Sequence, residues 1–213
     1  MAARYWITGG ITNNWSDTSN WSTTSGGGGG SAVPTAADDV TFDGAGNSNC
    51  TLNTSTAKLA KSLTVTAGYT QTLTFNVTLT VSGNVSLGAN MAFAGSSELI
   101  VDATSTLTSN GKTLGVPFRL KNVASTFTLA DDWTVPSITL EPSAVGTMTV
   151  NSNTLNITGS VTTLSTSSRI TGGTTLFNLT GTGTWSGTGT IINNLTINTA
   201  GTITVSGTVN YGT

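Results

Sequence analysis

The side chains of this sequence that could do chemistry are mainly carboxylates, because its 213 residues include no histidine and a single cysteine. Without histidine, a Ser-His-Asp or Cys-His centre, the usual general base near neutral pH and the commonest metal ligand are missing. One cysteine supports neither an intramolecular disulfide nor a structural zinc site, so we interpret Cys50 as a small buried residue of a strand. No P-loop or dinucleotide-binding glycine motif occurs. The sequence therefore predicts no cofactor and no metal site.

The acidic residues are the remaining candidates for catalysis, because pairs of Asp or Glu side chains cleave glycosidic bonds. The candidates are Asp38, Asp39, Asp43, Glu98, Asp102, Asp131, Asp132 and Glu141. Adjacent strand residues point to opposite faces, so Asp131 and Asp132 could share a substrate only from a turn. Trp133 beside them offers a sugar-stacking surface, but we favour a turn of hydrogen-bonding Asp residues followed by a core or rim tryptophan. No catalytic residue is assigned.

The elements that must position these side chains are strands and turns. From about residue 50 onward, apolar residues alternate with Thr, Ser or Asn at period two, as in LTFNVTLTVSGNVSL at 73–87. Gly or Asn interrupts the alternation every several residues, and no stretch sustains helical spacing. The sequence therefore predicts an all-β protein.

Three segments at 73–87, 148–164 and 195–211 resemble one another, and they share Gly83, Gly159 and Gly207. The separations of these glycines fit three and two steps of about 24 to 25 residues, a length typical of solenoid repeats. We therefore predict a parallel β-helix, with inward apolar ladders and Asn ladders at the turns. A jelly-roll or Greek-key sandwich is the alternative, because it also has short strands with frequent turns.

Residues 1–45 differ from the repetitive body at 46–213. They include Trp6, Trp15 and Trp21, and a run of five glycines at 26–30 predicts a loop. Val40 and Phe42 alternate with polar residues, as in a half-buried strand. An open solenoid exposes strand edges at its ends, so we interpret the tryptophans as a capping cluster rather than a ligand-stacking platform. Residues 1–45 are thus a predicted N-terminal cap or attachment region.

The charge and hydropathy of the sequence limit the kinds of partner that the protein is expected to bind. Charged residues make up 8% of the chain, against about 25% in typical soluble domains, which predicts that neighbouring copies cover much of the surface. The net charge is −2 and the seven basic residues are scattered, so nucleic-acid binding is not expected. Lys58 and Lys61, the closest basic pair, are interpreted as solvated edge charges. No long apolar run predicts a membrane span, and the beginning MAARYWITGG lacks an export signal, which predicts assembly in a cytoplasm.

The N-terminal stretch resembles a module of uncharacterised bacteriophage particle proteins, and also the starts of repeat blocks in bacterial autotransporter-like β-helix proteins. The resemblance rests on the tryptophans, the glycine run, Val33-Pro34-Thr35, and Asp38-Asp39-Val40 with Phe42. It covers about 43 residues and implies a parallel β-helix in an extracellular or virion setting, without catalytic residues. The absent export signal favours the bacteriophage setting.

Together these observations predict a non-enzymatic virion structural protein, either a capsid decoration (cement) subunit or a short fibre or spike. A homo-oligomer, with a trimer as the first hypothesis, would contact the major capsid or tail protein. A receptor- or glycan-binding tail module that uses Trp133 and Trp185 is the alternative function. A polysaccharide depolymerase is the third hypothesis, but the chain is short and its acids are few.

Overall fold

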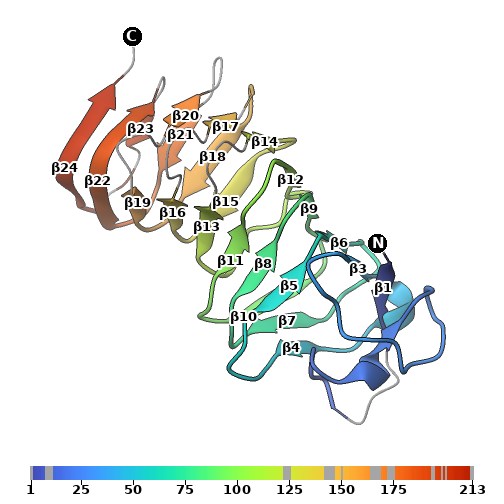
Figure 1. Ribbon diagram of the computed structural model, residues 1–213. Coiled ribbons are helices and arrows are strands. Elements are labelled where there is room, and N and C mark those ends of the chain that lie inside the picture. Colours follow the sequence, from blue (N-terminus) through green and yellow to red (C-terminus); the bar gives the residue numbers. More distant parts are fainter. Residues whose placement is uncertain are drawn as a thin grey trace.

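The computed structural model shows an all-β protein whose strands coil around one axis. It describes residues 2–7, 12–121, 126–141, 147–149, 151–163, 169–171, 176–192, 195–197, 199 and 201–211. Within these residues the helical elements are two short 3-10 turns, η1 (Thr18–Asn20) and η2 (Gly44–Gly46). The two ends of the chain lie at opposite ends of the stack (Figure 1). The predicted parallel β-solenoid is confirmed, and the sandwich alternative is not what the chain forms.

The strands lie on three faces, here called A, B and C, and most coils contribute one short strand to each. Face C consists of two separate sheets, because the coil at residues 105–121 contributes to it only an isolated bridge between Thr113 and Thr134. Face A holds β1 (Ala3–Trp6), β3 (Asp39–Phe42), β6 (Ser62–Val65), β9 (Val85–Ser86), β12 (Ser105–Thr108), β14 (Thr126–Leu129), β17 (Thr147–Thr149) and β20 (Arg169–Thr171). Face B holds β5 (Lys58–Ala60), β8 (Leu79–Val81), β11 (Leu99–Val101), β13 (Phe118–Lys121), β16 (Ile138–Glu141) and β19 (Val161–Thr163). Face C holds β4 (Cys50–Leu52), β7 (Thr72–Phe75), β10 (Ala92–Gly95), β15 (Trp133–Val135), β18 (Thr154–Ile157), β21 (Leu176–Leu179) and β23 (Leu195–Ile197).

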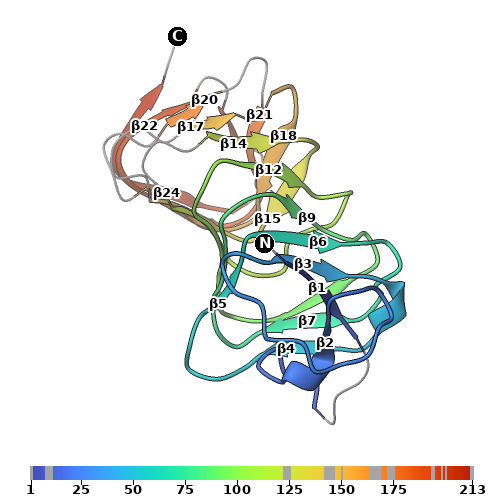
Figure 2. The same cartoon turned by 45° about the vertical axis from the view of Figure 1, so that its right-hand side comes forward.

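Two long strands, β22 (Gly183–Ile192) and β24 (Ile203–Tyr211), run from face B into face A without a break. At the other end of the stack, β2 (Trp21–Ser22) pairs antiparallel with β1. The remaining strand pairs are parallel, and Figure 2 shows the coils following one another from the N-terminal strands. Chain segments one coil apart therefore lie side by side throughout the described stack.

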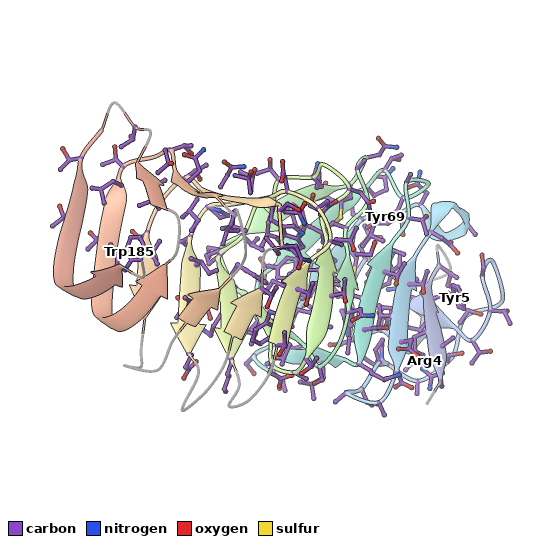
Figure 3. The ribbon with its side chains drawn as sticks, turned by 90° about the horizontal axis from the view of Figure 1, so that it is seen from above. Arg4, Tyr5, Tyr69 and Trp185 are labelled. Carbon is purple, nitrogen blue, oxygen red and sulfur yellow. The ribbon has the colours of Figure 1, made fainter. Side chains whose placement is uncertain are left out.

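The core is a set of inward ladders that the period-two alternation creates. Leu63 pairs with Val85, and Val85 with Leu107, so equivalent residues are 22 positions apart and all three are buried. Full burial of one such side chain contributes about 1.5–3 kcal/mol. Tyr69 and Trp185 lie toward opposite ends of this core (Figure 3). The inward ladder explains why strands such as β6, β8 and β13 bury alternate residues.

The coil is shorter than the sequence comparison predicts. Paired residues are commonly 20 to 23 positions apart, as in Leu79 with Leu99 and Val40 with Leu63. Gly83 and Gly207 lie where face B passes into face A, whereas Gly159 lies between faces C and B. The middle segment is therefore one face out of phase with the other two, which is why the predicted step of about 24 to 25 residues was too long.

The N-terminal end of the core is filled by aromatic side chains. Trp6, Trp15 and Trp21 are all fully buried, and ring centroids lie 5.2 Å apart for Trp6 and Trp21 and 4.7 Å apart for Trp15 and Trp21 in edge-to-face contact. The Trp21 Nε1–H donates to the Trp15 carbonyl at 2.7 Å. Because no indole face is exposed, the interpretation as a capping cluster is correct and the stacking platform is not formed.

Strand pairing runs across the border between the two predicted regions. Strand β3 belongs to the first 45 residues, yet it pairs along its length with β6, beyond that border. Val40 and Phe42 of β3 are buried as predicted, and the glycine run at 26–30 lies in the loop between β2 and β3. The division at residue 45 stays a prediction about organisation, because the core itself is continuous there.

Candidate functional site

The corner where face A turns into face C is held together by Asn side chains. The Asn47 side-chain oxygen accepts from the Thr70 N–H at 2.9 Å, one coil further along. In the opposite direction, Asn90 donates to the Ala67 carbonyl and Asn110 to the Leu87 carbonyl, each at 2.8 Å. Asn110 has a φ of 51°, a left-handed conformation that Asn tolerates better than most residues. The predicted Asn ladder therefore exists, and it joins each coil to its neighbours.

Asp131 and Asp132 belong to the same corner. The Asp131 carboxylate accepts from the Ser109 N–H at 2.7 Å and from the Asn110 N–H at 2.6 Å, both in the preceding coil. Asp132 accepts from the Thr154 N–H at 2.7 Å, in the following coil. These two carboxylates thus bind backbone donors on opposite sides, which confirms the turn interpretation.

Near the N-terminus, Asp38 and Asp43 are also bonded within the chain. Asp38 accepts from the Thr35 N–H at 3.0 Å and hydroxyl at 2.8 Å, and it lies 3.9 Å from Arg4. Burial works to raise the pKa of Asp38, but the Thr35 hydrogen bonds and the Arg4 charge together hold it below the ordinary value. Asp43 caps η2 by accepting from the Ala45 N–H at 3.0 Å.

On face B, Glu98, Arg119 and Glu141 form an ion-pair ladder across three successive coils. The Arg119 guanidinium lies 2.8 Å from Glu98 and 3.0 Å from Glu141. The hydrogen bond to Glu98, followed by that to Glu141, raises the pKa of Arg119 against the opposing effect of burial. Asp102 follows β11, and its N–H donates to the Val81 carbonyl at 3.1 Å. The structure therefore spreads the predicted acids over separate corners and faces.

The tryptophans proposed for glycan stacking lie inside the core. Trp133 is 1% exposed and Trp185 is 2% exposed. Trp133 is in register with Leu155, and its ring packs against Phe118 with centroids 5.4 Å apart. Both indoles occupy inward positions of the alternation, as the favoured interpretation of Trp133 predicts, and their rings are not exposed for the alternative of sugar stacking.

Lys58 is buried, contrary to the interpretation as a solvated edge charge. Its ammonium group donates to the Ser16 hydroxyl at 2.7 Å and to the Thr54 hydroxyl at 2.8 Å. Burial lowers the pKa of Lys58. Lys61, in contrast, is partly exposed and lies 3.6 Å from Asp39. Lys58 therefore joins the N-terminal segment to the first coil, whereas Lys61 faces the surface.

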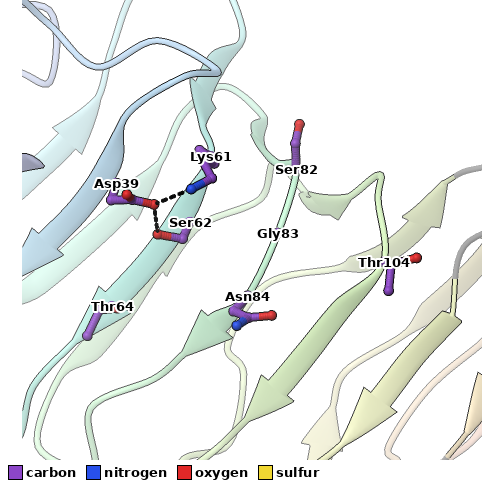
Figure 4. Close-up of a pocket in the computed structure, with 8 residues that line it drawn as sticks. All are labelled: Asp39, Lys61, Ser62, Thr64, Ser82, Gly83, Asn84 and Thr104. Carbon is purple, nitrogen blue, oxygen red and sulfur yellow. Dashed lines mark hydrogen bonds and ion pairs between the residues drawn. The ribbon is translucent and has the colours of Figure 1, made fainter. Parts of the chain in front are cut away.

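A hollow of about 420 Å³ opens at the corner where face B turns into face A (Figure 4). It crosses four successive levels of the stack and is lined by Asp39, Lys61, Ser62, Thr64, Ser82, Gly83, Asn84 and Thr104. Every lining side chain is polar or absent. No sequence motif pointed to this hollow, because its residues come from segments that only coiling brings together.

The length of the corner explains the hollow. Strand β5 ends at Ala60 and β6 begins at Ser62, so Lys61 alone makes the first corner. In the next coil, the corner between Val81 and Val85 has three residues. A Cβ at Gly83 would lie 2.7 Å from the Lys61 carbonyl oxygen, so the longer corner passes directly against the shorter one. The hollow lies at this change in corner length.

Within the described residues, no group of three or more His, Cys, Asp or Glu side chains is placed to hold a metal ion. No helix in this described part is long and apolar enough to cross a membrane. Cys50 is fully buried in β4, as predicted, and burial raises the pKa of its thiol.

Comparison with protein-family models, curated proteins and solved structures finds no match to this chain. The class of protein is therefore defined by its own architecture, which is a three-faced parallel β-solenoid with an aromatic N-terminal end.

Proposed function

We propose that this chain is a non-enzymatic structural protein of a bacteriophage particle, serving as a capsid decoration (cement) subunit or as a short fibre or spike. The observation that carries the proposal is the continuous core, which runs from Trp6 to Trp185 with coil-to-coil hydrogen bonds along one corner. Such a stack resists bending and shear, because every coil is packed against the next. A rigid rod of this kind suits a decoration subunit that bridges neighbouring capsid subunits, or a fibre or spike that extends from the particle.

The use of the acids supports a non-enzymatic role. Asp131 and Asp132 bind backbone donors, Glu98 and Glu141 bind one arginine, and Asp43 caps a turn. A glycosidase needs two carboxylates on either side of one bond. Glu98 and Glu141 share the Arg119 guanidinium, and Asp131 and Asp132 bond to the backbone in opposite directions. Asp39 alone among the acids lines the hollow.

The chain acts as a homo-oligomer in this proposal, with a trimer expected first. Its support is the low charge of 8% in a protein whose outer faces carry mainly Thr, Ser and Asn. Partner copies and the major capsid or tail protein would cover this surface, and burial of apolar area yields about 25 cal/mol per Å². Sedimentation of the purified chain measures the copy number directly, and a monomer at micromolar concentration would count against the oligomer.

Locating the chain in intact particles tests the function. Cryo-electron microscopy of the phage that encodes it is expected to show density at regular capsid positions, or at the tail or one vertex. The first outcome assigns decoration, and the second assigns a fibre or spike. Absence from purified particles would overturn the structural role.

Survival of heated particles then tests cementing. Particles with the protein are expected to survive heat better than particles from a deletion phage, because binding favours the assembled state by mass action. Added purified protein should restore survival. Equal survival with and without the protein would exclude a cement function.

A further inference from the structure

We infer that the hollow between faces B and A is a binding site for a neutral, hydroxyl-rich saccharide segment. This inference adds a ligand to the protein and does not depend on the proposed place in a particle. It rests on the shape of the hollow, the hydrogen-bonding groups that line it and their spacing along the stack.

The lining offers donors and acceptors with few competing apolar groups. Lys61 donates, Asp39 accepts, and the hydroxyls of Ser82 and Thr104 can do both. The Ser62 hydroxyl, which donates to Asp39, can accept from a ligand. Adjacent hydroxyls of a sugar ring present the same mixture of donors and acceptors. A ligand without hydroxyls would displace water from these polar groups without replacing its hydrogen bonds, which costs free energy and disfavours apolar molecules.

The charges in the hollow select a neutral ligand. Lys61 and Asp39 lie 3.6 Å apart, and each side chain is 39% exposed. The Ser62 hydroxyl donates to the same Asp39 carboxylate at 2.6 Å (Figure 4). Since the ammonium and carboxylate groups neutralise each other, the hollow attracts neither anions nor cations strongly. Sugar hydroxyls can bridge such a pair without adding a charge.

The spacing matches a chain of sugar rings. Ser62, Asn84 and Thr104 come from successive coils, which are about 4.8 Å apart in a parallel sheet. Three levels therefore span about 10 Å, the length of one to two sugar rings along the stack. An oligosaccharide that lies parallel to the solenoid axis would meet a new polar side chain at each level.

Gly83 belongs to a wall of the hollow and packs closely against the Lys61 backbone. A Cβ at this position would approach the Lys61 carbonyl oxygen to 2.7 Å, so a side chain is excluded from this wall of the hollow. Thr64 stands at the exposed side of the hollow on face A. A large side chain at position 64 would fill the hollow from its rim, whereas the same change at Thr128, on the same face but one coil beyond the last lining residue, would not.

The affinity is expected to be weak. Ligand sites of about 300–1,000 Å³ are usually lined by apolar and aromatic groups, which this hollow lacks. We expect a dissociation constant of about 1 mM for one site. Several copies in an oligomer would bind a repetitive polysaccharide more tightly than one site.

Nuclear magnetic resonance of the purified full chain tests the site. The probes are neutral hexasaccharides of glucose, galactose, mannose and N-acetylglucosamine, each titrated to about 10 mM, well above the expected dissociation constant. At least one is expected to shift the amide signals of Ser62, Asn84 and Thr104 while leaving those of Arg119 unchanged. Absence of shifts with all four probes would overturn the inference.

Two variants with a matched control show whether the hollow itself binds. Thr64→Phe is expected to weaken binding at least about tenfold, and Ser82→Ala about twofold to fivefold. Thr128→Phe, an outward-facing change on the same face, should leave binding unchanged. Circular dichroism confirms that each variant is folded. Equal binding by Thr64→Phe and the wild type would place the ligand elsewhere and refute the site.

Discussion

Two corners of the same solenoid use polar side chains in different ways. At the corner between faces A and C, Asn47, Asn110 and Asp131 bond to the backbone of neighbouring coils. At the corner between faces B and A, Ser62, Ser82 and Thr104 line an open hollow. Similar residue types thus bond to neighbouring coils at one corner and line an accessible hollow at the other. Residue type alone does not distinguish the two uses.

We call the corner between faces A and C the sealed corner and the corner between faces B and A the open corner. The largest loss of stability is expected when the Asp131 side chain is removed from the sealed corner. Asp131→Ala leaves the N–H groups of Ser109 and Asn110 without their acceptor, and Ser109 is 1% exposed. We expect the free energy of unfolding to fall by about 2–3 kcal/mol. Urea denaturation measures this change. Asp131→Asn, which keeps one acceptor oxygen, should lose less, and a loss below about 0.5 kcal/mol in the alanine variant would contradict the sealed-corner description.

Glycine substitutions compare the two corners directly. Gly83→Ala places a Cβ against the Lys61 carbonyl, and we expect a loss of about 2 kcal/mol from this overpacking. Gly111, at the sealed corner, has open space around it but a φ of +75°, so Gly111→Ala should lose about 1 kcal/mol through backbone strain. Asn at position 111 should be tolerated better than Ala, whereas Asn at 83 should be worse. If urea denaturation shows a smaller loss for Asn than for Ala at position 83, and a larger one at position 111, close packing does not distinguish the two corners.

A smaller effect is expected at Asn84. Its side-chain oxygen accepts from the Thr106 N–H at 2.9 Å, but this hydrogen bond is exposed to water. Asn84→Ala should therefore lower the free energy of unfolding by about 0.5–1 kcal/mol, because water replaces the lost acceptor. Thermal unfolding of Asn84→Ala and Asp131→Ala under the same conditions compares the stability lost at the two corners. Equal losses in the two variants would show that the two corners do not differ in this respect.

The smallest effect at neutral pH is expected for Asp38→Asn, and its main consequence appears in acid. The pKa of Asp38 is lowered in the folded chain, so its charged form stabilises the fold above the unfolded pKa of about 3.9, and this contribution is lost as pH falls through the lower folded value. Urea midpoints at about pH 6 and pH 3 should differ more for the wild type than for Asp38→Asn. Asp17, whose pKa is also lowered by hydrogen bonds from Ser19 and Thr12, keeps part of the acid dependence. If the wild type and Asp38→Asn lose the same stability between about pH 6 and pH 3, Asp38 does not contribute to the acid sensitivity of the fold.

Sequence patterns were sufficient for the parts of the fold that depend on local alternation. Strand β3, with Val40 and Phe42 inward, and the burial of Cys50 follow from period two and residue type. The tryptophan cluster also followed from the sequence, because three large aromatics near an open end bury the most area by closing it. These predictions needed no knowledge of which coils are neighbours.

Predictions that required the coil register were less successful. Gly159 resembles Gly83 in local sequence but lies at another corner, since an apolar-Thr-apolar pattern suits all three faces equally. The alternative function needed exposed rings at Trp133 and Trp185, but the register places both rings inside. For Trp133 this agrees with the favoured interpretation as a core or rim residue. Lys58 was proposed for the surface and instead donates to Ser16, a residue 42 positions away.

The sequence by itself determined that this chain forms strands, turns at Asn and Gly, and one elongated apolar core. The reason is local, because side-chain alternation and turn preferences act within a few residues. The tertiary structure decided which side chain faces which, from the Asp131 contacts to the hollow beside Lys61. These contacts join residues about one coil apart, and their positions depend on the length of each corner, to which period-two alternation is insensitive.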